Sequence, residues 1–146
     1  MKKSIQSPSA GATRRIAREL AGSILKEPLR KGALVLAFKG ELGAGKTSFI
    51  KGLAKGLGVQ GNVLSPTFLI LKSYPLAQGR TFWHADCYRL SSPRELAGLG
   101  FKEIVKDPGA IVAVEWADKV SSLLPRDALW ILLSHKGPLT REIRFG

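Results

Sequence analysis

Residues 40–47 read GELGAGKT and place a lysine and a hydroxyl residue directly after closely spaced glycines. A polyphosphate needs hydrogen-bond donors that converge on it without side chains in the way, and glycine at positions 43 and 45 lets backbone N–H groups do this. Lys46 would add a positive charge, and the Thr47 hydroxyl would coordinate a Mg²⁺ ion that bridges the outer phosphates. The pattern therefore predicts a P-loop that binds ATP and Mg²⁺, with a simple glycine turn as the alternative.

Two acidic residues are candidates to complete such a site. Glu115 follows the apolar run 111–114, so it could reach the magnesium shell or orient a water from the end of a buried strand; a surface ion pair is the alternative. Asp86 could supply a second acid at the metal, position the attacking water, or pair with Arg89, and the sequence leaves these open. Lys46, Asp86 and Glu115 are thus the candidate catalytic residues, and Thr47 and Glu115 the candidate metal ligands.

Four other residues near these candidates could be either structural or part of the site. His84 and Asp86 lie on the same face of a predicted strand because side chains alternate with period two, and we expect His84 to be structural. Cys87 is expected to be a small buried residue. Trp116 is either a core residue or part of the site. Thr67, in the run SPTF, either senses the terminal phosphate or belongs to a proline turn that leads into a strand.

The elements that position these residues follow from hydrophobic periodicity. A helix is predicted from Thr13, as its N-cap, to Pro28. The continuous apolar run 33–38 predicts a central strand covered on both faces, and a second helix begins at Lys46 and ends at residues 56–58. Strand, glycine loop and helix thus follow in the order that a P-loop requires.

The rest of the chain predicts a sheet with strands of both directions. Strands are expected at 68–71 and 81–85, paired antiparallel, at 111–115, and at 129–133 and 142–145 on the edges. Ser92 caps a short helix that runs to about Gly100. The expected fold class is α/β, a single P-loop NTPase-like domain over residues 1–146 with a small mixed sheet flanked by helices.

Composition sets limits on the function. The chain has 146 residues, one cysteine and no apolar run near the roughly 20 residues that a membrane helix needs, so we expect a cytosolic protein without membrane contact. With 23 Lys and Arg against 11 Asp and Glu, the net charge is +12. That charge would attract a polyanion or an acidic protein surface, or it only helps solubility.

Five segments in chain order resemble the TsaE (YjeE) family of bacterial ATPases. They span most of the chain and are residues 40–48, SPTF at 65–68, the pattern His84-x-Asp86-x-Tyr88-Arg89-Leu90, LGFKE at 99–103 and VEW at 114–116. The P-loop is the only specific motif among them; the others gain weight from their order.

The resemblance implies an ATPase that supports synthesis of threonylcarbamoyladenosine next to the tRNA anticodon, together with TsaD and TsaB. TsaD would transfer the threonylcarbamoyl group, and ATP hydrolysis by this subunit would reset the assembly. It implies Thr47 and Glu115 as magnesium ligands, Lys46 as a phosphate contact and Asp86 as a residue needed for hydrolysis. The residues expected to contact the nucleotide are Ala10, Thr13, Glu41, Leu42, Gly43, Ala44, Gly45, Lys46, Thr47, Ser48 and Trp116.

Three other functions compete with this interpretation. A small-molecule kinase would use the same phosphate grip, but it normally needs an arginine-bearing lid, and residues 91–107 contain Arg94 as their only arginine. A GTPase would show an Asn-Lys-x-Asp motif, which is absent, so ATP is preferred over GTP. A nucleotide-switched module that binds RNA or protein is the non-enzymatic alternative, and direct contact with tRNA is left open.

Overall fold

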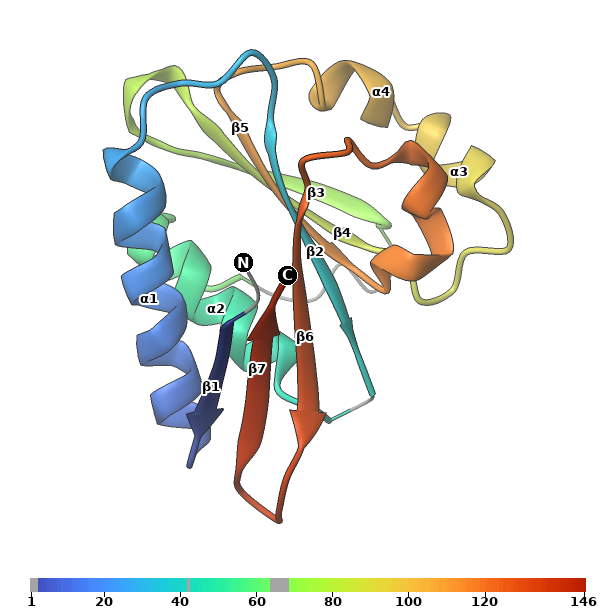
Figure 1. Cartoon of the computed structure of the whole chain (residues 1–146). Coiled ribbons are helices and arrows are strands. Elements are labelled where there is room, and N and C mark those ends of the chain that lie inside the picture. The colour runs from blue at the N-terminus through green and yellow to red at the C-terminus, as the bar shows by residue number, and fades with distance from the viewer. Residues whose placement is uncertain (1–2, 42, 64–68) are drawn as a thin grey trace.

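The computed structural model describes residues 3–41, 43–63 and 69–146. These residues form seven strands and four α-helices, joined by two short 3₁₀ segments (Figure 1). In chain order they are β1 Lys3–Ser7, α1 Ala10–Lys26, β2 Leu34–Gly40, α2 Lys46–Leu57, β3 Leu71–Pro75, η1 Ala77–Gly79, β4 Thr81–Asp86, α3 Pro93–Ala97, α4 Phe101–Ile104, β5 Ala110–Glu115, η2 Ala117–Leu123, β6 Leu129–His135 and β7 Arg141–Phe145.

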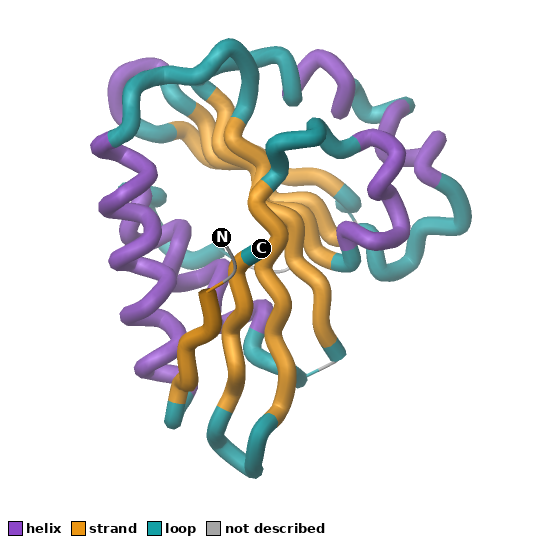
Figure 2. The backbone as a smooth tube through the Cα atoms, viewed as in Figure 1, coloured by secondary structure: helices purple, strands orange, loops and turns teal. Residues whose placement is uncertain are grey.

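All seven strands belong to one twisted sheet with the order β1-β7-β6-β2-β5-β4-β3 (Figure 2). The four middle strands β6, β2, β5 and β4 run parallel. Strands β7 and β1 add antiparallel on one side, and β3 adds antiparallel on the other. The predicted α/β class with a mixed sheet is confirmed.

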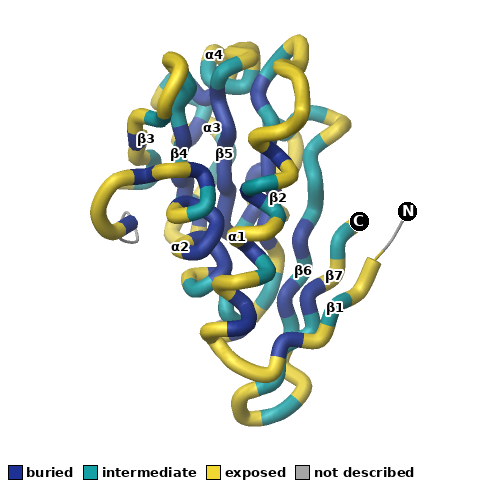
Figure 3. Tube along the Cα trace, turned by 90° about the vertical axis from the view of Figure 1, so that its left-hand side faces the viewer, coloured by how far each residue is buried: buried dark blue, intermediate teal, exposed yellow. Residues whose placement is uncertain are grey.

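Alternation along the central strands creates two cores, one on each face of the sheet. In β2, Leu36 and Phe38 face the core beneath α1 and α2, whereas Val35 and Ala37 face the core beneath α3, α4 and η2. Figure 1 shows these two groups of helices on opposite sides of the sheet. Strand β5 is buried along its whole length, and the N-terminal β1 is largely exposed (Figure 3). The carboxyl ends of β2, β4 and β5 are therefore held from both sides.

The prediction that 129–133 and 142–145 form edge strands is wrong. Strand β6 pairs parallel with β2 and antiparallel with β7, so it lies inside the sheet. Strand β7 is covered by β1, which the sequence analysis missed. Charged residues in the run 141–145 resemble those of an edge, and the pairing depends on a partner 138 residues away, such as Ser4 hydrogen-bonded to Glu142.

The predicted start of the first helix is also wrong. Helix α1 begins at Ala10, and Ser9 is its N-cap, because the Ser9 side chain accepts a hydrogen bond from the Ala12 N–H. Thr13 is instead buried inside the first turn, where its hydroxyl lies 2.7 Å from the Ser7 hydroxyl. This contact connects β1 to α1.

Two further elements differ from the prediction in their bounds. The helix expected at 92–100 has Ser92 as its cap, but it ends at Ala97, and a second helix, α4, follows after Gly100 in a left-handed conformation (φ 88°). The third strand runs from Leu71 to Pro75 instead of 68–71, and it pairs antiparallel with β4 as expected. Thr67 and the rest of 64–68 lie outside the described residues. None of the helices described by the structure is long and apolar enough to cross a membrane.

Candidate nucleotide-binding site

The glycine-rich loop joins the end of β2 to the start of α2, as predicted. Gly43 (φ 76°) and Gly45 (φ 99°) adopt left-handed conformations that other residues rarely tolerate. Gly45 is the N-cap of α2 and offers no side chain to its first turn. The first N–H groups of this 12-residue helix thus have no partner within the helix, and its positive end favours an anion.

Lys46 is the first residue of α2 and is buried, with 5% of its surface exposed. Its Nζ donates a hydrogen bond to the Gly40 carbonyl and lies 3.8 Å from the centre of the Trp116 ring. Among the described residues it has no ion-pair partner. Burial lowers the pKa of Lys46 from its ordinary value of 10.5, although nearby acids, Glu115 foremost, act against that shift. A buried ammonium group compensated in this way is well suited to a phosphate.

Glu115 ends β5 next to the carboxyl ends of two neighbouring strands. Its backbone is in register with Phe38 of β2 and with Asp86 of β4. Its Oε2 lies 2.7 Å from the Nε2 of His84, and both side chains are buried. A carboxylate only accepts hydrogen bonds, so the compatible arrangement has the His84 Nε2–H donating. His84 therefore orients the candidate magnesium ligand, a contact that the sequence analysis did not find.

Asp86 lies on the same face of β4 as His84, one residue pair further towards the strand end. Its Oδ1 accepts a hydrogen bond of 3.0 Å from the Tyr88 N–H. An ion pair with Arg89, one of the alternatives left open, is not among those that the described residues form. The Asp86 carboxylate is close enough to Lys46 to raise the pKa of that amine, which places it at the same site.

Trp116 follows Glu115 in a left-handed conformation (φ 56°), which is uncommon for a bulky residue. Its ring is partly buried, faces Lys46 and lies 5.0 Å from the ring of Tyr88. Both alternatives for Trp116 thus apply, since one part of the side chain packs on the core and another covers the site. Such a strained residue is often held in place because of function.

These groups line a cavity of ≈ 410 Å³. Its walls combine the loop and the start of α2 with the N-terminal turn of α1 and the ends of β4 and β5. They consist of Ala10, Thr13, Gly43, Gly45, Lys46, Thr47, Ser48, Asp86, Tyr88, Glu115, Trp116, Leu139 and Arg141.

Most residues proposed from the sequence therefore lie together, with three exceptions. Glu41 is exposed and Ala44 is fully buried, and neither lines the cavity. Leu42 lies outside the described residues.

Tyr88, Leu139 and Arg141 line the cavity without having been predicted. Tyr88 belonged to one of the five family segments, so a signal for it existed. Leu139 and Arg141 had none, because only the pairing of β7 with β6 brings them to the loop.

The residues present are compatible with magnesium brought by a nucleotide. In the part of the chain that the structure describes, no group of three or more His, Cys, Asp or Glu side chains is placed to hold a metal. Mg²⁺ usually takes one or two protein oxygens and completes its shell with substrate phosphates and water. Thr47 and Glu115, which line the same cavity, could provide those two oxygens.

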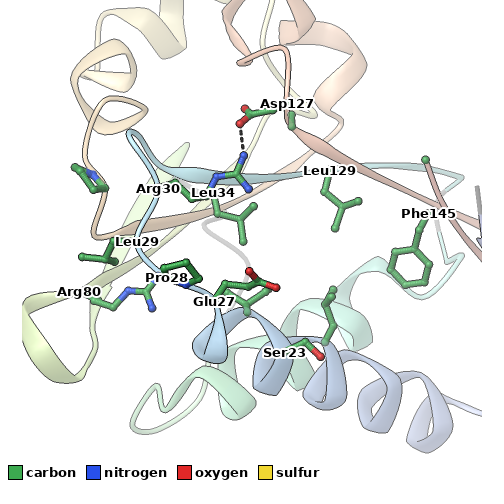
Figure 4. Close-up of a pocket in the computed structure, with 15 residues that line it drawn as sticks. Ser23, Glu27, Pro28, Leu29, Arg30, Leu34, Arg80, Asp127, Leu129 and Phe145 are labelled. Carbon is green, nitrogen blue, oxygen red and sulfur yellow. Dashed lines mark hydrogen bonds and ion pairs between the residues drawn. The ribbon is translucent and has the colours of Figure 1, made fainter. Parts of the chain in front are cut away.

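A larger cavity, ≈ 710 Å³, lies at the other end of the sheet (Figure 4). The last turns of α1 and the start of β2 at Leu34 form its walls, and Arg30 and Asp127 make an ion pair across its rim. The glycine-rich loop follows the opposite end of β2. This cavity is therefore separate from the candidate nucleotide site.

A comparison with family models decides the affiliation of the chain. Residues 7–143 match the model described as threonylcarbamoyl adenosine biosynthesis protein TsaE. The chain belongs to the TsaE family.

Similar proteins agree with this assignment. The TsaE protein of Treponema pallidum is 41% identical over 123 residues, which cover 84% of this chain and 87% of that protein. The TsaE protein of Bacillus subtilis is 41% identical over 116 residues, covering 76% of this chain and 68% of that protein. The crystal structure of YdiB from Bacillus subtilis superposes with a TM-score of 0.77 at 32% identity and covers 99% of this chain and 84% of that one.

Membership in the TsaE family confirms the resemblance seen in the five segments. It connects the chain to threonylcarbamoyladenosine biosynthesis, the process for which the family is named. The YdiB superposition extends the agreement to the fold, including the mixed sheet.

Proposed function

We propose that this TsaE-family chain binds Mg-ATP and hydrolyses it to support tRNA threonylcarbamoyladenosine synthesis, together with TsaD and TsaB. The observation that carries the proposal is Lys46, a buried amine at the positive end of α2. It directly follows a loop with two left-handed glycines and is close to acids from β4 and β5. The names of the related proteins support the tRNA modification part of the proposal.

Each part of the site has a role in this reaction. The N–H groups of the loop and the Lys46 amine would hold the phosphates, while Thr47 and Glu115 would hold Mg²⁺. When bound, Mg²⁺ neutralises the charge that develops on the transferred phosphoryl group. Asp86 orients the attacking water from the neighbouring strand end.

The surrounding side chains prepare the site for hydrolysis. His84 fixes the Glu115 carboxylate through the 2.7 Å hydrogen bond. The Trp116 ring covers the Lys46 amine and limits access of bulk water, and the Tyr88 ring packs against Trp116. Arg141 reaches the cavity from β7, a strand of the sheet, so it does not provide the mobile lid of a kinase.

Two substitutions test the proposal in purified protein. Lys46→Ala should weaken Mg-ADP binding at least about tenfold in calorimetry, since a charged hydrogen-bond donor to phosphate is lost. Glu115→Gln should keep nucleotide affinity and lose magnesium-dependent turnover. We expect slow ATP hydrolysis by the wild type alone and faster hydrolysis when TsaB and TsaD are added.

Lys39→Ala is the matched control, because Lys39 belongs to the end of β2 but is exposed outside the cavity. It should behave as the wild type. Unchanged nucleotide binding by Lys46→Ala would contradict the phosphate grip, and full turnover by Glu115→Gln would contradict the magnesium role. ATP consumption that depends on a small-molecule acceptor would favour a kinase instead.

A further inference from the structure

A groove of ≈ 220 Å³ lies between α1 and α2 and carries only positive charges among its described residues. Each helix contributes two cations four residues apart, Arg14 and Arg18 from α1 and Lys51 and Lys55 from α2. We call these four residues and the surface between them the basic groove. Its other described walls are Gly52, Ala54, Gly61, Asn62 and Val63.

Glycines in α2 bring the four cations together. A Cβ atom at Gly52 would lie 2.4 Å from the Arg14 carbonyl oxygen, and one at Gly56 would lie 2.7 Å from the Ala21 Cβ. The two helix backbones therefore approach more closely than side chains would allow. The arginines of α1 lie beside the lysines of α2 as a result.

No group among the described residues neutralises these charges. All four side chains are exposed, and none makes an ion pair with a described residue. Like charges at i and i+4 repel each other on a helix, and this occurs on both helices at once. This repulsion destabilises the folded protein, so the four cations do not serve its stability. Binding of an external anion is a better explanation for their presence.

The form of the groove selects the kind of anion. Its cations are exposed and follow two helices, which suits a chain of successive phosphates better than one small ion. The described walls offer no aromatic or large apolar side chain, whereas protein interfaces depend on such anchors. A nucleic-acid backbone fits these properties, and an acidic protein surface fits them less well.

We propose that the basic groove binds the phosphodiester backbone of tRNA. The choice of tRNA rests on the proposed function, because the modification concerns tRNA, but the inference does not require ATP hydrolysis. The groove also adjoins the nucleotide cavity without sharing residues with it. Thr13 and Ser48 line the cavity, while Arg14 and Lys51 line the groove.

The test measures binding of a fluorescein-labelled, unmodified tRNA transcript by anisotropy over a range of salt concentrations. The double variant Arg18→Gln/Lys55→Gln removes two positive charges and keeps good helix formers. We expect about tenfold weaker binding at physiological salt and a salt slope that is lower by about 1.8, or roughly 0.9 for each lost phosphate contact.

Lys102→Gln/Lys106→Gln is the matched control. Like the groove variant, it removes two positive charges, but from exposed positions in and just after α4, on the other face of the sheet. It should change affinity less than about threefold, as expected for long-range attraction alone. Circular dichroism and melting temperatures verify that both variants fold.

Three results would overturn the proposal. The first is an equal loss of tRNA binding in both double variants, and the second is no loss in the groove variant. The third is tighter binding of poly-L-glutamate than of tRNA by the wild-type protein, which would favour an acidic protein as the partner. Calorimetry with Mg-ADP on the same groove variant separates the two hypotheses. If nucleotide binding is absent in every protein while tRNA binding depends on the groove, the ATPase proposal fails and this one stands.

Discussion

Neighbouring strands of the sheet determine where the Glu115 carboxylate lies in the candidate site. The Glu115 backbone lies in register between Phe38 and Asp86, and its carboxylate is bound to His84. A carboxylate that must take one position benefits from such a partner, because the hydrogen bond removes rotamers that point elsewhere. The geometry of the acid thus depends on a residue that does not line the cavity.

We predict that His84→Leu lowers turnover by about 10- to 100-fold, as loss of a partner of a metal ligand typically does. Mg-ADP affinity should change much less, since Lys46 and the loop N–H groups remain. His84→Gln should recover most of the activity because its amide can still donate to Glu115. The measurement is a kcat assay together with the Mg²⁺ concentration needed for half-maximal rate.

The glutamine variant separates positioning from packing. If His84 only fills space, leucine and glutamine should have similar effects, and the requirement for Mg²⁺ should stay the same. A raised Mg²⁺ requirement in His84→Leu alone would be the signature of a misplaced Glu115 carboxylate. Equal kcat and equal Mg²⁺ dependence in the two variants would show that the hydrogen bond is irrelevant.

Contact between α1 and α2 determines the shape of both the nucleotide cavity and the basic groove. The two helices pack on each other along much of their length, and α1 contributes Ala10 and Thr13 to the cavity. Helical periodicity predicted each helix separately. It could not predict how closely they approach, because that depends on which glycines face the partner helix.

Two glycine-to-alanine substitutions test this contact. Gly52→Ala places a methyl group 2.4 Å from the Arg14 carbonyl oxygen, so it should destabilise the protein by about 1–3 kcal/mol. Gly22→Ala, in α1, meets nothing within 4 Å and should stabilise by about 0.5–1 kcal/mol, because alanine restricts the unfolded chain. Urea denaturation measures both changes. A stabilising effect of Gly52→Ala would contradict this, because it would mean that α1 and α2 can move apart without a cost in folding free energy.

Local patterns in the sequence predicted the centre of the molecule well. The apolar runs 33–38 and 111–114 became parts of β2 and β5, and the glycine loop with Lys46 lies where expected. These features depend on neighbours in the chain. The hydrophobic run, the glycines and the helix start are adjacent, so no distant partner is needed to specify them.

Features that depend on distant partners were predicted less well. Strand β1 was missed because its polar sequence gains its strand conformation only from pairing with β7 at the far end of the chain. Thr13 looked like a helix cap, but Ser9 with β1 in front of it takes that role. Arg141 and Leu139 reach the cavity through another such pairing, that of β7 with β6.

The reactivity of the Cys87 thiol measures local opening of the folded protein around the site. Cys87 is the only cysteine of the sequence, is fully buried, and donates its N–H to the Glu115 carbonyl oxygen. Burial, with smaller contributions from Asp86 and Glu115, raises the pKa of its thiol to about 12. Because the thiolate is the nucleophile that attacks a thiol reagent, Cys87 should react at pH 8 only after the ends of β4 and β5 separate.

We therefore predict slow labelling of native protein by a thiol reagent and complete labelling in urea. Mg-ADP should slow native labelling by a factor of about 1 + [ADP]/Kd, roughly 100-fold at 100 times Kd, because opening at Cys87 also takes apart the candidate site. Lys46→Ala should abolish that protection. Rapid labelling of the native protein would contradict burial of the thiol. A slow labelling rate that Mg-ADP does not change would show that opening at Cys87 and nucleotide binding are independent.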